Sequence, residues 1–436
     1  MSSTSLRKVL RSLFLLAIGI LAVGVPLFDL LEHIGGEALF SRGWFHAAGA
    51  PFGMAAVILC ALQFVVASRL QLIDRLFPLN RQFQAHRWFG SAALLCALVH
   101  PIILFFPRIF TPWHIAVRHW PELLGVVALA SLAGAVCGAF LRKRLHIAFD
   151  RWLPLHRSGT LAIAVLAGTH FAFAEGHFEF GGIHLLLVGA LAIYLISRFQ
   201  RGHAYRVTHV SLVGRDTVAI DLVPQSGTGF GFVPGQFALV TFCSAGLPRE
   251  QHPWTISSAP CQDGALQFTI RKCGDFTSKI DQVQPGDRAL IKGPYGMFGH
   301  AALEDPAADL VLIAGGIGIT PFLSIMRYLA ATGSTRQVVL IWSVRTAADM
   351  AWQEDLMALE RVLPGLRLHV VMTRQQNPQG SSGRLNAAVL QTLLADVSAD
   401  CPIFICGPAG MRTTVAAGLK SCGFSPRRIL HEEFTL

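Results

Sequence analysis

The first 200 residues alternate between long apolar stretches and short polar connections. Six stretches carry no charged residue, and they cover residues 12–28, 43–68, 88–107, 123–141, 158–174 and 180–197. Each has about the length that a helix needs to cross a bilayer, roughly 20 residues. None shows the polar stripe that a surface helix of a water-soluble protein presents along one side. The pattern therefore predicts six membrane-spanning helices.

Basic residues are unevenly shared among the connections. Most lie before the first stretch, between the second and third, between the fourth and fifth, and after the sixth, whereas the other connections carry three arginines and six acidic residues. Because Lys and Arg gather on the cytoplasmic side, both ends of the chain are expected in the cytoplasm. A basic segment before an apolar core is also typical of a signal peptide. No small-residue cleavage site follows it, so we expect the first stretch to be retained; its removal would leave the orientation of the other five unchanged.

After residue 201 the hydrophobic pattern changes to short segments separated by Gly, Pro and Asp turns. Alternating segments cover residues 205–213, 218–223, 236–242, 265–271 and 288–292, which predicts a small antiparallel β-barrel. Four strands of buried type, 310–314, 337–343, 366–372 and 403–406, then alternate with helices that begin near Thr320, Ala347, Arg384 and Gly410. This alternation predicts a doubly wound α/β domain with a parallel sheet. The expected domains are therefore 1–201 with six transmembrane helices, 202–304 with the barrel and 305–436 with the α/β fold.

Composition agrees with a chain that lies partly in lipid. Hydrophobic residues make up 53% of it and charged residues 14%, against about 25% charged residues in average soluble domains. The formal charge of +10 does not indicate nucleic-acid binding, because the basic residues fall in short connections and no nucleic-acid motif accompanies them. The nine cysteines include no Cys-x-x-Cys pair, so neither a disulfide framework nor a zinc site is expected.

Four histidines share one spacing on two of the predicted membrane-spanning helices. His86 and His100 are fourteen residues apart on the third helix, and His156 and His170 are fourteen apart on the fifth. Fourteen positions return to within roughly 40° of the same helix face, about 21 Å along the axis. Since both helices run from inside to outside, His86 lies at the depth of His156 and His100 at that of His170. Two facing imidazoles at each of two depths are what bis-histidine haem requires.

Two segments of the second half carry candidate binding chemistry for a flavin. Hydroxyls alternate around an aromatic in His252-Pro253-Trp254-Thr255-Ile256-Ser257-Ser258, which suits a flavin lying along a strand. Arg271 ends a later strand. The segment Gly274-Asp275-Phe276-Thr277 then opens a helix whose backbone N–H groups suit a phosphate.

Two further segments suit a dinucleotide. The turn Gly315-Gly316-Ile317-Gly318-Ile319-Thr320-Pro321 follows a predicted strand and leads into a helix. Glycines let backbone N–H groups approach a pyrophosphate, and the helix N-terminus contributes partial positive charge. Cys406-Gly407-Pro408 ends the last parallel strand at the sheet edge where ligands bind.

With these motifs the chain resembles the NADPH oxidase and ferric reductase superfamily over nearly its whole length. The resemblance implies a ferric-reductase-type membrane domain with two stacked b-type haems on His86, His100, His156 and His170, followed by an FAD and an NAD(P) module. The family's FAD motif is His-Pro-Phe-Thr-x-x-Ser, and here Trp254 replaces the Phe. The family also places a C-terminal aromatic over the flavin, and Phe434 fits, although Thr435 and Leu436 follow it. Ser343 and Arg345 stand where the family often contacts the 2′-phosphate, which favours NADPH and leaves NADH open.

The resemblance implies an integral membrane enzyme, expected in a bacterial inner membrane with its FAD and NAD(P) module in the cytoplasm. Its expected partners are membrane lipid, NAD(P)H and a small outer-face electron acceptor, either an Fe(III) chelate or O2. Oxidases of the family carry a further histidine close beyond the outer ligand, whereas position 104 here is Leu; this weakens a superoxide-producing oxidase without removing it. A haem-free transporter or sensor regulated by a flavin module is the alternative from another class.

Overall fold

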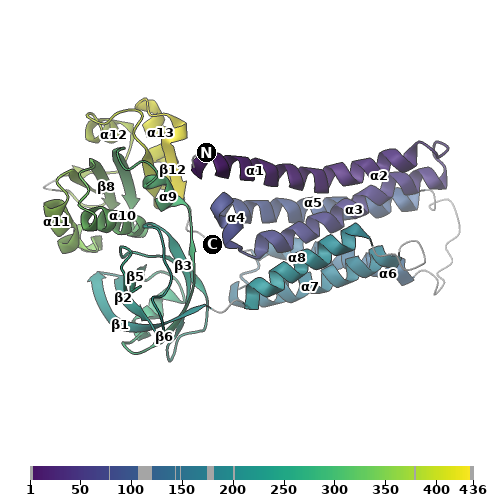
Figure 1. The fold of residues 1–436 in the computed structure, drawn as a ribbon, viewed down its shortest axis with the longest axis horizontal. Helices are drawn as coiled ribbons and strands as arrows, with labels where there is room; N and C mark the ends of the chain where they lie inside the picture. The colour runs from purple at the N-terminus through teal and green to yellow at the C-terminus, as the bar shows by residue number, and fades with distance from the viewer. Residues whose placement is uncertain are drawn as a thin grey trace. The chain divides into compact units, whose positions relative to one another are not determined.

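The computed structural model describes residues 3–77, 79–106, 120–142, 144–147, 149–173, 181–199, 202–377 and 380–432. The chain divides into two compact units, Met1–Gln200 and Arg201–Leu436. The first unit is helical among the residues described, and its long helices run alongside one another (Figure 1). In chain order the helices are α1 (Ser3–Gly19), a π-helical turn (Ile20–Gly24), α2 (Val25–Ile34), α3 (Arg42–Ala67), α4 (Gln71–Leu76), α5 (Leu79–Phe105), α6 (Trp120–Leu141), α7 (Phe149–Phe173) and α8 (Gly182–Phe199).

Five helical segments of the described part are long and apolar enough to cross a membrane. They are Val9–Ile34, Arg42–Ala67, Arg81–Phe105, Trp120–Leu141 and Gly182–Phe199. Of the predicted span 158–174, the described residues 158–173 lie in α7. This helix is not among the five because His156, Arg157 and His170 interrupt its apolar character. The predicted number of six spans is therefore not confirmed, although five apolar helices are present.

The membrane unit is built around α3. This helix packs against α2, α5 and α8, while α6 packs against α7. A core cluster of Val57, Ala61, Phe64, Ala164, Leu187, Ala190 and Tyr194 joins α3, α7 and α8. Many apolar side chains of α1 and α6 face outward, as expected where the surrounding solvent is lipid.

The second unit begins with an antiparallel sheet. Its strands are β1 (His203–Gly214), β2 (Thr217–Pro224), β3 (Phe237–Cys243), β4 (His252–Thr255), β5 (Leu266–Arg271) and β6 (Arg288–Tyr295), in the order β4-β3-β6-β1-β2-β5. The predicted barrel closure is not confirmed. Among the residues described, the two end strands β4 and β5 share no ladder; an isolated bridge between Ile256 and Phe268 and hydrogen bonds of residues 257 and 258 link the segment after β4 to β5.

A parallel sheet follows, with helices on both faces (Figure 1). Its strands are β7 (Leu310–Gly315), β8 (Val338–Val344), β9 (Leu366–Met372), β10 (Ser381–Ser382), β11 (Ile403–Cys406) and β12 (Ile429–Glu432), ordered β10-β9-β8-β7-β11-β12. The helices are α9 (Phe298–Ala302), α10 (Thr320–Ala331), α11 (Gln353–Val362), α12 (Ala387–Leu393) and α13 (Ala409–Ser421). One core cluster joins the sheet to α10 and α11, and another joins it to α12 and α13. The doubly wound fold is thus confirmed, and β10 and β12 are strands that the hydrophobic pattern did not predict.

Candidate functional site

The four spaced histidines lie in two facing pairs between α5 and α7. The ring centroids of His86 and His156 are 6.3 Å apart, and those of His100 and His170 are 6.2 Å apart. A metal bound by imidazole nitrogen at about 2 Å on each side places the two ring centres roughly 6 Å apart. The spacing in each pair therefore fits one iron held between two axial imidazoles.

Backbone carbonyl groups fix the rings of the second pair. Nδ1 of His100 lies 3.0 Å from the carbonyl oxygen of Gly49 on α3, and Nδ1 of His170 lies 2.7 Å from that of Pro121 on α6. A carbonyl only accepts, so Nδ1 carries the proton in both rings. Nε2 is then the nitrogen with a free lone pair, which is the arrangement typical of a metal-binding histidine.

Glycines leave room for these imidazoles. A Cβ on Gly53 of α3 would lie 2.9 Å from both Cε1 and Nδ1 of His100, and a Cβ on Gly125 of α6 would lie 2.8 Å from Cε1 of His170. Real Cβ atoms essentially never approach that closely. The two flanking helices therefore present a bare backbone where each ring packs.

The first pair has a different surrounding. Nδ1 of His86 and Nδ1 of His156 are buried and have no hydrogen-bond partner within the part of the chain that the structure describes. The indole of Trp152 stacks on His156 with ring centroids 4.6 Å apart. Buried polar atoms of this kind are rare in native proteins and often mark a site that holds a further group.

The segment predicted to bind flavin begins with β4, an end strand of the antiparallel sheet. His252, Trp254 and Phe276 form an aromatic cluster, with the His252 and Phe276 rings 4.1 Å apart. Nε2 of His252 lies 3.1 Å from a carboxylate oxygen of Glu250. Burial lowers the pKa of His252 below its usual value, and the Glu250 carboxylate opposes that shift.

The hydroxyls of this segment contact the sheet itself. Ser257 is fully buried, and its Oγ lies 2.9 Å from Oγ1 of Thr269. Ser258 Oγ accepts a hydrogen bond of 3.1 Å from the backbone N–H of Gln267. Thr255 is also buried. The Ser257 and Ser258 hydroxyls therefore hold this segment against β5.

The predicted helix after Gly274 is a short 3-10 segment, Thr277–Gln282. Gly274 adopts a φ of +93°, a value that favours glycine, and turns the chain into it. The Thr277 hydroxyl donates to the Cys273 carbonyl at 2.7 Å and accepts from the Cys273 N–H at 2.8 Å, which closes the loop on itself. Asp275 and Gly274 are exposed, so this turn is open to a phosphate group.

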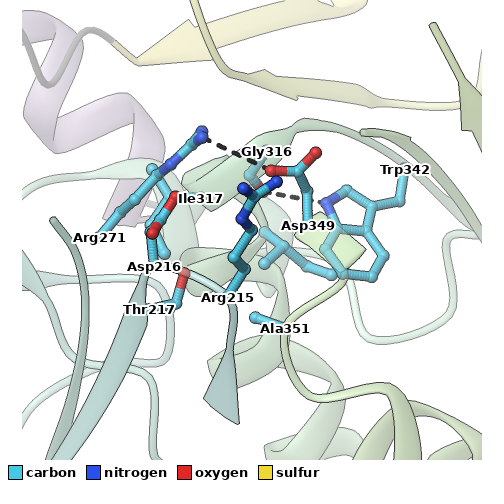
Figure 2. Close-up of a pocket in the computed structure, with 10 residues that line it drawn as sticks. Arg215, Asp216, Thr217, Arg271, Gly316, Ile317, Trp342, Asp349 and Ala351 are labelled. Carbon is cyan, nitrogen blue, oxygen red and sulfur yellow. Dashed lines mark hydrogen bonds and ion pairs between the residues drawn. The ribbon is translucent and has the colours of Figure 1, made fainter. Parts of the chain in front are cut away.

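Arg271 lines a pocket formed by both sheets (Figure 2). Its Nη2 lies 3.8 Å from a carboxylate oxygen of Asp349, which belongs to the segment after β8. The pocket is lined by Arg215, Asp216, Thr217, Arg271, Gly316, Ile317, Ile319, Trp342, Asp349 and Ala351. Arg215 and Arg271, from the part of the chain that forms the antiparallel sheet, thus lie beside the glycine turn of the parallel sheet, where an anionic dinucleotide is expected.

The two glycine motifs of the parallel sheet lie side by side at its carboxyl edge. Ala314 of β7 pairs with Cys406 of β11, and these two strands mark the point where the strand order reverses. A Cβ on Gly407 would lie 3.0 Å from Cα of Gly315, and a Cβ on Gly318 would collide with the Cys406 carbonyl. Ligands of doubly wound sheets bind at this switch point. The close packing explains why both turns need glycine.

The indole of Trp342 and the hydroxyl of Thr320 complete this turn. Trp342 donates 2.9 Å to the Gly316 carbonyl, and Thr320 donates 3.1 Å to the Ile317 carbonyl. Pro321 occupies the first turn of α10, where a missing N–H costs nothing. Pro408 likewise precedes α13.

The residues predicted for the 2′-phosphate lie at the carboxyl end of β8, with Ser343 inside the strand and Arg345 directly after it. Ser343 is buried near the strand end, and Arg345 is exposed beyond it. Phe434, predicted to stack on the flavin, lies outside the described residues.

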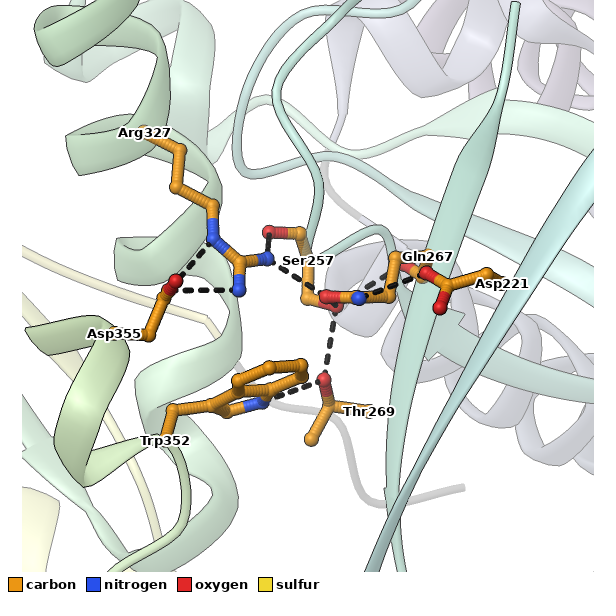
Figure 3. A network of polar contacts seen from close by, with 7 residues as sticks. All are labelled: Asp221, Ser257, Gln267, Thr269, Arg327, Trp352 and Asp355. Carbon is orange, nitrogen blue, oxygen red and sulfur yellow. Dashed lines mark hydrogen bonds and ion pairs between the residues drawn. The ribbon is translucent and has the colours of Figure 1, made fainter. Parts of the chain in front are cut away.

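The sequence analysis did not predict one cluster of polar and aromatic side chains around Arg327. Arg327 of α10 contacts Asp355, Trp352 and the backbone carbonyl of Ser257, which follows β4 (Figure 3). The sequence feature that could have indicated this cluster is that Arg327 is the only charged residue in the apolar helix Thr320–Ala331.

Three family models match consecutive parts of the chain. They are the ferric reductase like transmembrane component at residues 52–169, an FAD-binding domain at 203–298 and the oxidoreductase NAD-binding domain at 312–417. A membrane part of the ferric reductase type followed by these two modules defines a class of membrane flavin oxidoreductases. The chain belongs to the NADPH oxidase and ferric reductase superfamily by this domain architecture.

The matches to individual relatives cover only part of the length of each relative. Dual oxidase 2 of Homo sapiens is 24% identical over 382 residues, which cover 76% of this chain and 24% of that protein. The reductase component of propane 2-monooxygenase from Rhodococcus jostii is 26% identical over 53% of this chain, and the match spans 63% of the relative. The crystal structure of the Amycolatopsis cytochrome P450 reductase GcoB is 26% identical, covers 54% of this chain and 70% of its own, and has a TM-score of 0.47.

Proposed function

We propose that the protein is a transmembrane oxidoreductase that passes electrons from cytoplasmic NAD(P)H through FAD and two b-type haems to an acceptor on the outer face. The observation that carries the proposal is the pair of imidazole separations, 6.3 Å and 6.2 Å, at two depths of one helix pair. A haem, when bound there, supplies one-electron chemistry. His86 and His156 would hold the inner haem, and His100 and His170 the outer one.

The protein's own contribution at the outer pair is orientation. Hydrogen bonds from Nδ1 to main-chain carbonyls fix the tautomer and the ring plane, which leaves Nε2 as the nitrogen that would bind a metal. The bare backbone at Gly53 and Gly125 leaves the rings in place without steric conflict. A non-ligating nitrogen that donates to a carbonyl is the usual arrangement of a metal-binding histidine.

In the second unit we assign FAD to the segment from His252 to Ser258, with Arg271 and the turn 274–277 near its phosphates. NAD(P)H is assigned to the glycine turn at Gly315–Gly318 with Thr320 and Pro321, and to Cys406-Gly407-Pro408. The role of Phe434 over the flavin ring stays a proposal of the same kind. NADPH is preferred because Arg345 is exposed beside the end of β8 and suited to a 2′-phosphate.

The membrane arrangement is also proposed. α7 counts as a sixth span, because its His156 and His170 face the histidines of α5 inside the helical unit, as intramembrane polar residues do. The basic connections then place both ends, and the FAD and NAD(P) module, in the cytoplasm, with the bundle in a bacterial inner membrane.

The acceptor divides the proposal into two versions. A ferric reductase passes electrons to an Fe(III) chelate, whereas an oxidase passes them to O2 and forms superoxide. Leu104, one helical turn beyond His100, favours the reductase. Measuring superoxide and Fe(II) formation side by side, with NADPH and the purified protein in vesicles, decides between them.

A reduced-minus-oxidised absorbance spectrum of the purified protein tests the class. We expect a b-type haem band with a flavin band; a flavin band alone would favour the haem-free transporter or sensor. The variant His100→Ala should lose the outer-haem signal and transmembrane activity, while NAD(P)H-driven reduction of a soluble dye continues. If dye reduction vanished to the same extent, the proposed order of carriers would be wrong.

A further inference from the structure

Helix α10 holds the backbone of the predicted flavin segment at two consecutive positions. The hydroxyl of Ser324 donates to the Ser258 carbonyl at 2.6 Å, and Nη1 of Arg327 donates to the Ser257 carbonyl at 2.8 Å. Residues three positions apart lie on one face of a helix, so both donors point toward the antiparallel sheet. Ser324 is fully buried, and the Arg327 side chain is 17% exposed.

The Arg327 guanidinium uses its remaining donors to join three elements (Figure 3). Nε and Nη2 donate to one carboxylate oxygen of Asp355 on α11, at 3.0 Å and 2.8 Å. Nη1 also contacts Oε1 of Gln267 on β5 at 2.7 Å. A planar fork of this kind fixes the direction of each bond as well as its length.

Trp352 closes the cluster from the side. The Arg327 guanidinium carbon lies 4.8 Å from its ring centroid, and its indole N–H donates to Oγ1 of Thr269 on β5 at 3.1 Å. The Trp352 backbone has a φ of +62°, a conformation that side chains with a Cβ rarely adopt. The contacts of the indole with Arg327 and Thr269 accompany this backbone conformation.

The same helix begins at the glycine turn. Gly316–Ile319 leads directly into Thr320, so a nucleotide bound at that turn meets the N-terminus of α10. Ser324 and Arg327 lie about 6 Å and 10 Å further along the helix axis. One rigid helix therefore contacts the expected nucleotide at its start and the flavin segment along its next two turns.

We propose that Arg327 and Ser324 are positioning residues that set the distance and orientation between the nicotinamide and the flavin. The inference rests on the proposed function, in that it requires hydride transfer from NAD(P)H to FAD. Neither residue is placed against either cofactor; each acts through the main chain of residues 257 and 258. A displacement of about 1 Å at a reacting centre lowers rates by roughly 100-fold.

The test compares Arg327→Met with Arg336→Met in the full-length holoprotein. Arg336 is a matched control, because it is a partly buried arginine whose Nε and Nη1 donate to the carbonyls of Ala308 and Ala302 without reaching the flavin sheet. The readouts are FAD content, melting temperature, the rate of flavin reduction by NADPH, its KM, and the long-wavelength absorbance of reduced flavin stacked on oxidised nicotinamide.

For Arg327→Met we expect retained FAD, a KM within about threefold of wild type, flavin reduction slowed roughly 10- to 100-fold and a weakened long-wavelength band. Arg327→Lys should recover only part of the rate, since an ammonium cannot form the fork. Arg336→Met should lower the melting temperature and leave the rate and the band unchanged. Equal slowing in both methionine variants at matched melting temperature would overturn the inference.

Ser324→Ala keeps the inference testable if Arg327→Met does not fold. It removes one donor from a folded helix, and it should slow flavin reduction several-fold with FAD retained; an unchanged rate would overturn the inference. A measurement on the wild-type protein distinguishes failure of the proposed function from failure of the positioning role. If NADPH does not reduce its flavin at all, the proposed function fails, whereas normal reduction in every variant refutes only the positioning role.

Discussion

Replacing Gly125 with alanine tests whether α6 holds His170 as a metal ligand. The added Cβ would lie 2.8 Å from Cε1 and 2.9 Å from Nδ1 of the imidazole, so the ring has to move by several tenths of an ångström. That movement lengthens the 2.7 Å hydrogen bond from Nδ1 to the Pro121 carbonyl. The outer site then loses both its fit and its orientation.

The magnitude follows from these two contacts. Overpacking at a well-packed site costs about 1–3 kcal/mol, and a weakened hydrogen bond costs about 0.5–1.5 kcal/mol. We take about 2 kcal/mol as the loss expressed in haem binding, which corresponds to roughly 30-fold weaker binding at the outer pair. The inner pair, on the preceding turns of α5 and α7, should be unaffected.

The assay is the rate at which haem leaves the purified protein for an excess of a haem-accepting apoprotein, followed by absorbance. Gly134→Ala is the control, since it lies on the same helix α6 and a Cβ there meets nothing within 4 Å. Gly125→Ala should lose one haem of two roughly 30-fold faster than wild type, and Gly134→Ala should match wild type. Identical haem loss from the two variants would refute the reasoning.

Three further predictions concern the second unit. Gly407→Ala places a Cβ 3.0 Å from Cα of Gly315 and should raise the KM for NAD(P)H roughly tenfold or more with FAD content unchanged, as steady-state kinetics and flavin absorbance would show. Because burial lowers the folded-state pKa of His252, the stability from its neutral form is present above the usual pKa and is lost as pH falls. Glu250→Gln removes the opposing carboxylate, so the melting temperature should drop more between pH 7 and pH 5 than in wild type, and a smaller drop would contradict this assignment. Arg345→Ala should raise the KM for NADPH roughly tenfold and leave that for NADH unchanged; equal effects on both would exclude the 2′-phosphate contact.

The features predicted well from sequence are those encoded by local chemistry. Apolar length defined five of the membrane helices, and alternation of strands with helices defined the parallel sheet. The fourteen-residue spacing of His86 and His100 was enough to place both on one face, because helix geometry is fixed. The glycine turn at Gly315–Gly318 was readable because close approach to another backbone permits no other residue.

The remaining features depend on partners far apart in the chain. Barrel closure requires β4 and β5 to pair, and the sequence of either strand does not indicate whether the two edges form hydrogen bonds with each other. α7 is ambiguous because the histidines proposed to bind haem make it less apolar. The Arg327 cluster joins α10, α11 and β5, so its meaning appears only when Asp355 and Gln267 are brought together by folding.

The carbonyl groups that accept from His100 and His170 belong to the main chain of Gly49 and Pro121. A side-chain acceptor disappears with one substitution, whereas a peptide oxygen persists whatever residue occupies the position. Most substitutions at positions 49 and 121 therefore leave the hydrogen bonds of the His100 and His170 imidazoles in place. A shift or tilt of α3 or α6 as a whole helix would change those bonds. Bilayer thickness changes helix tilt. We therefore expect lipids of different chain length to alter the reduction potential of the proposed outer haem more than most single mutations do.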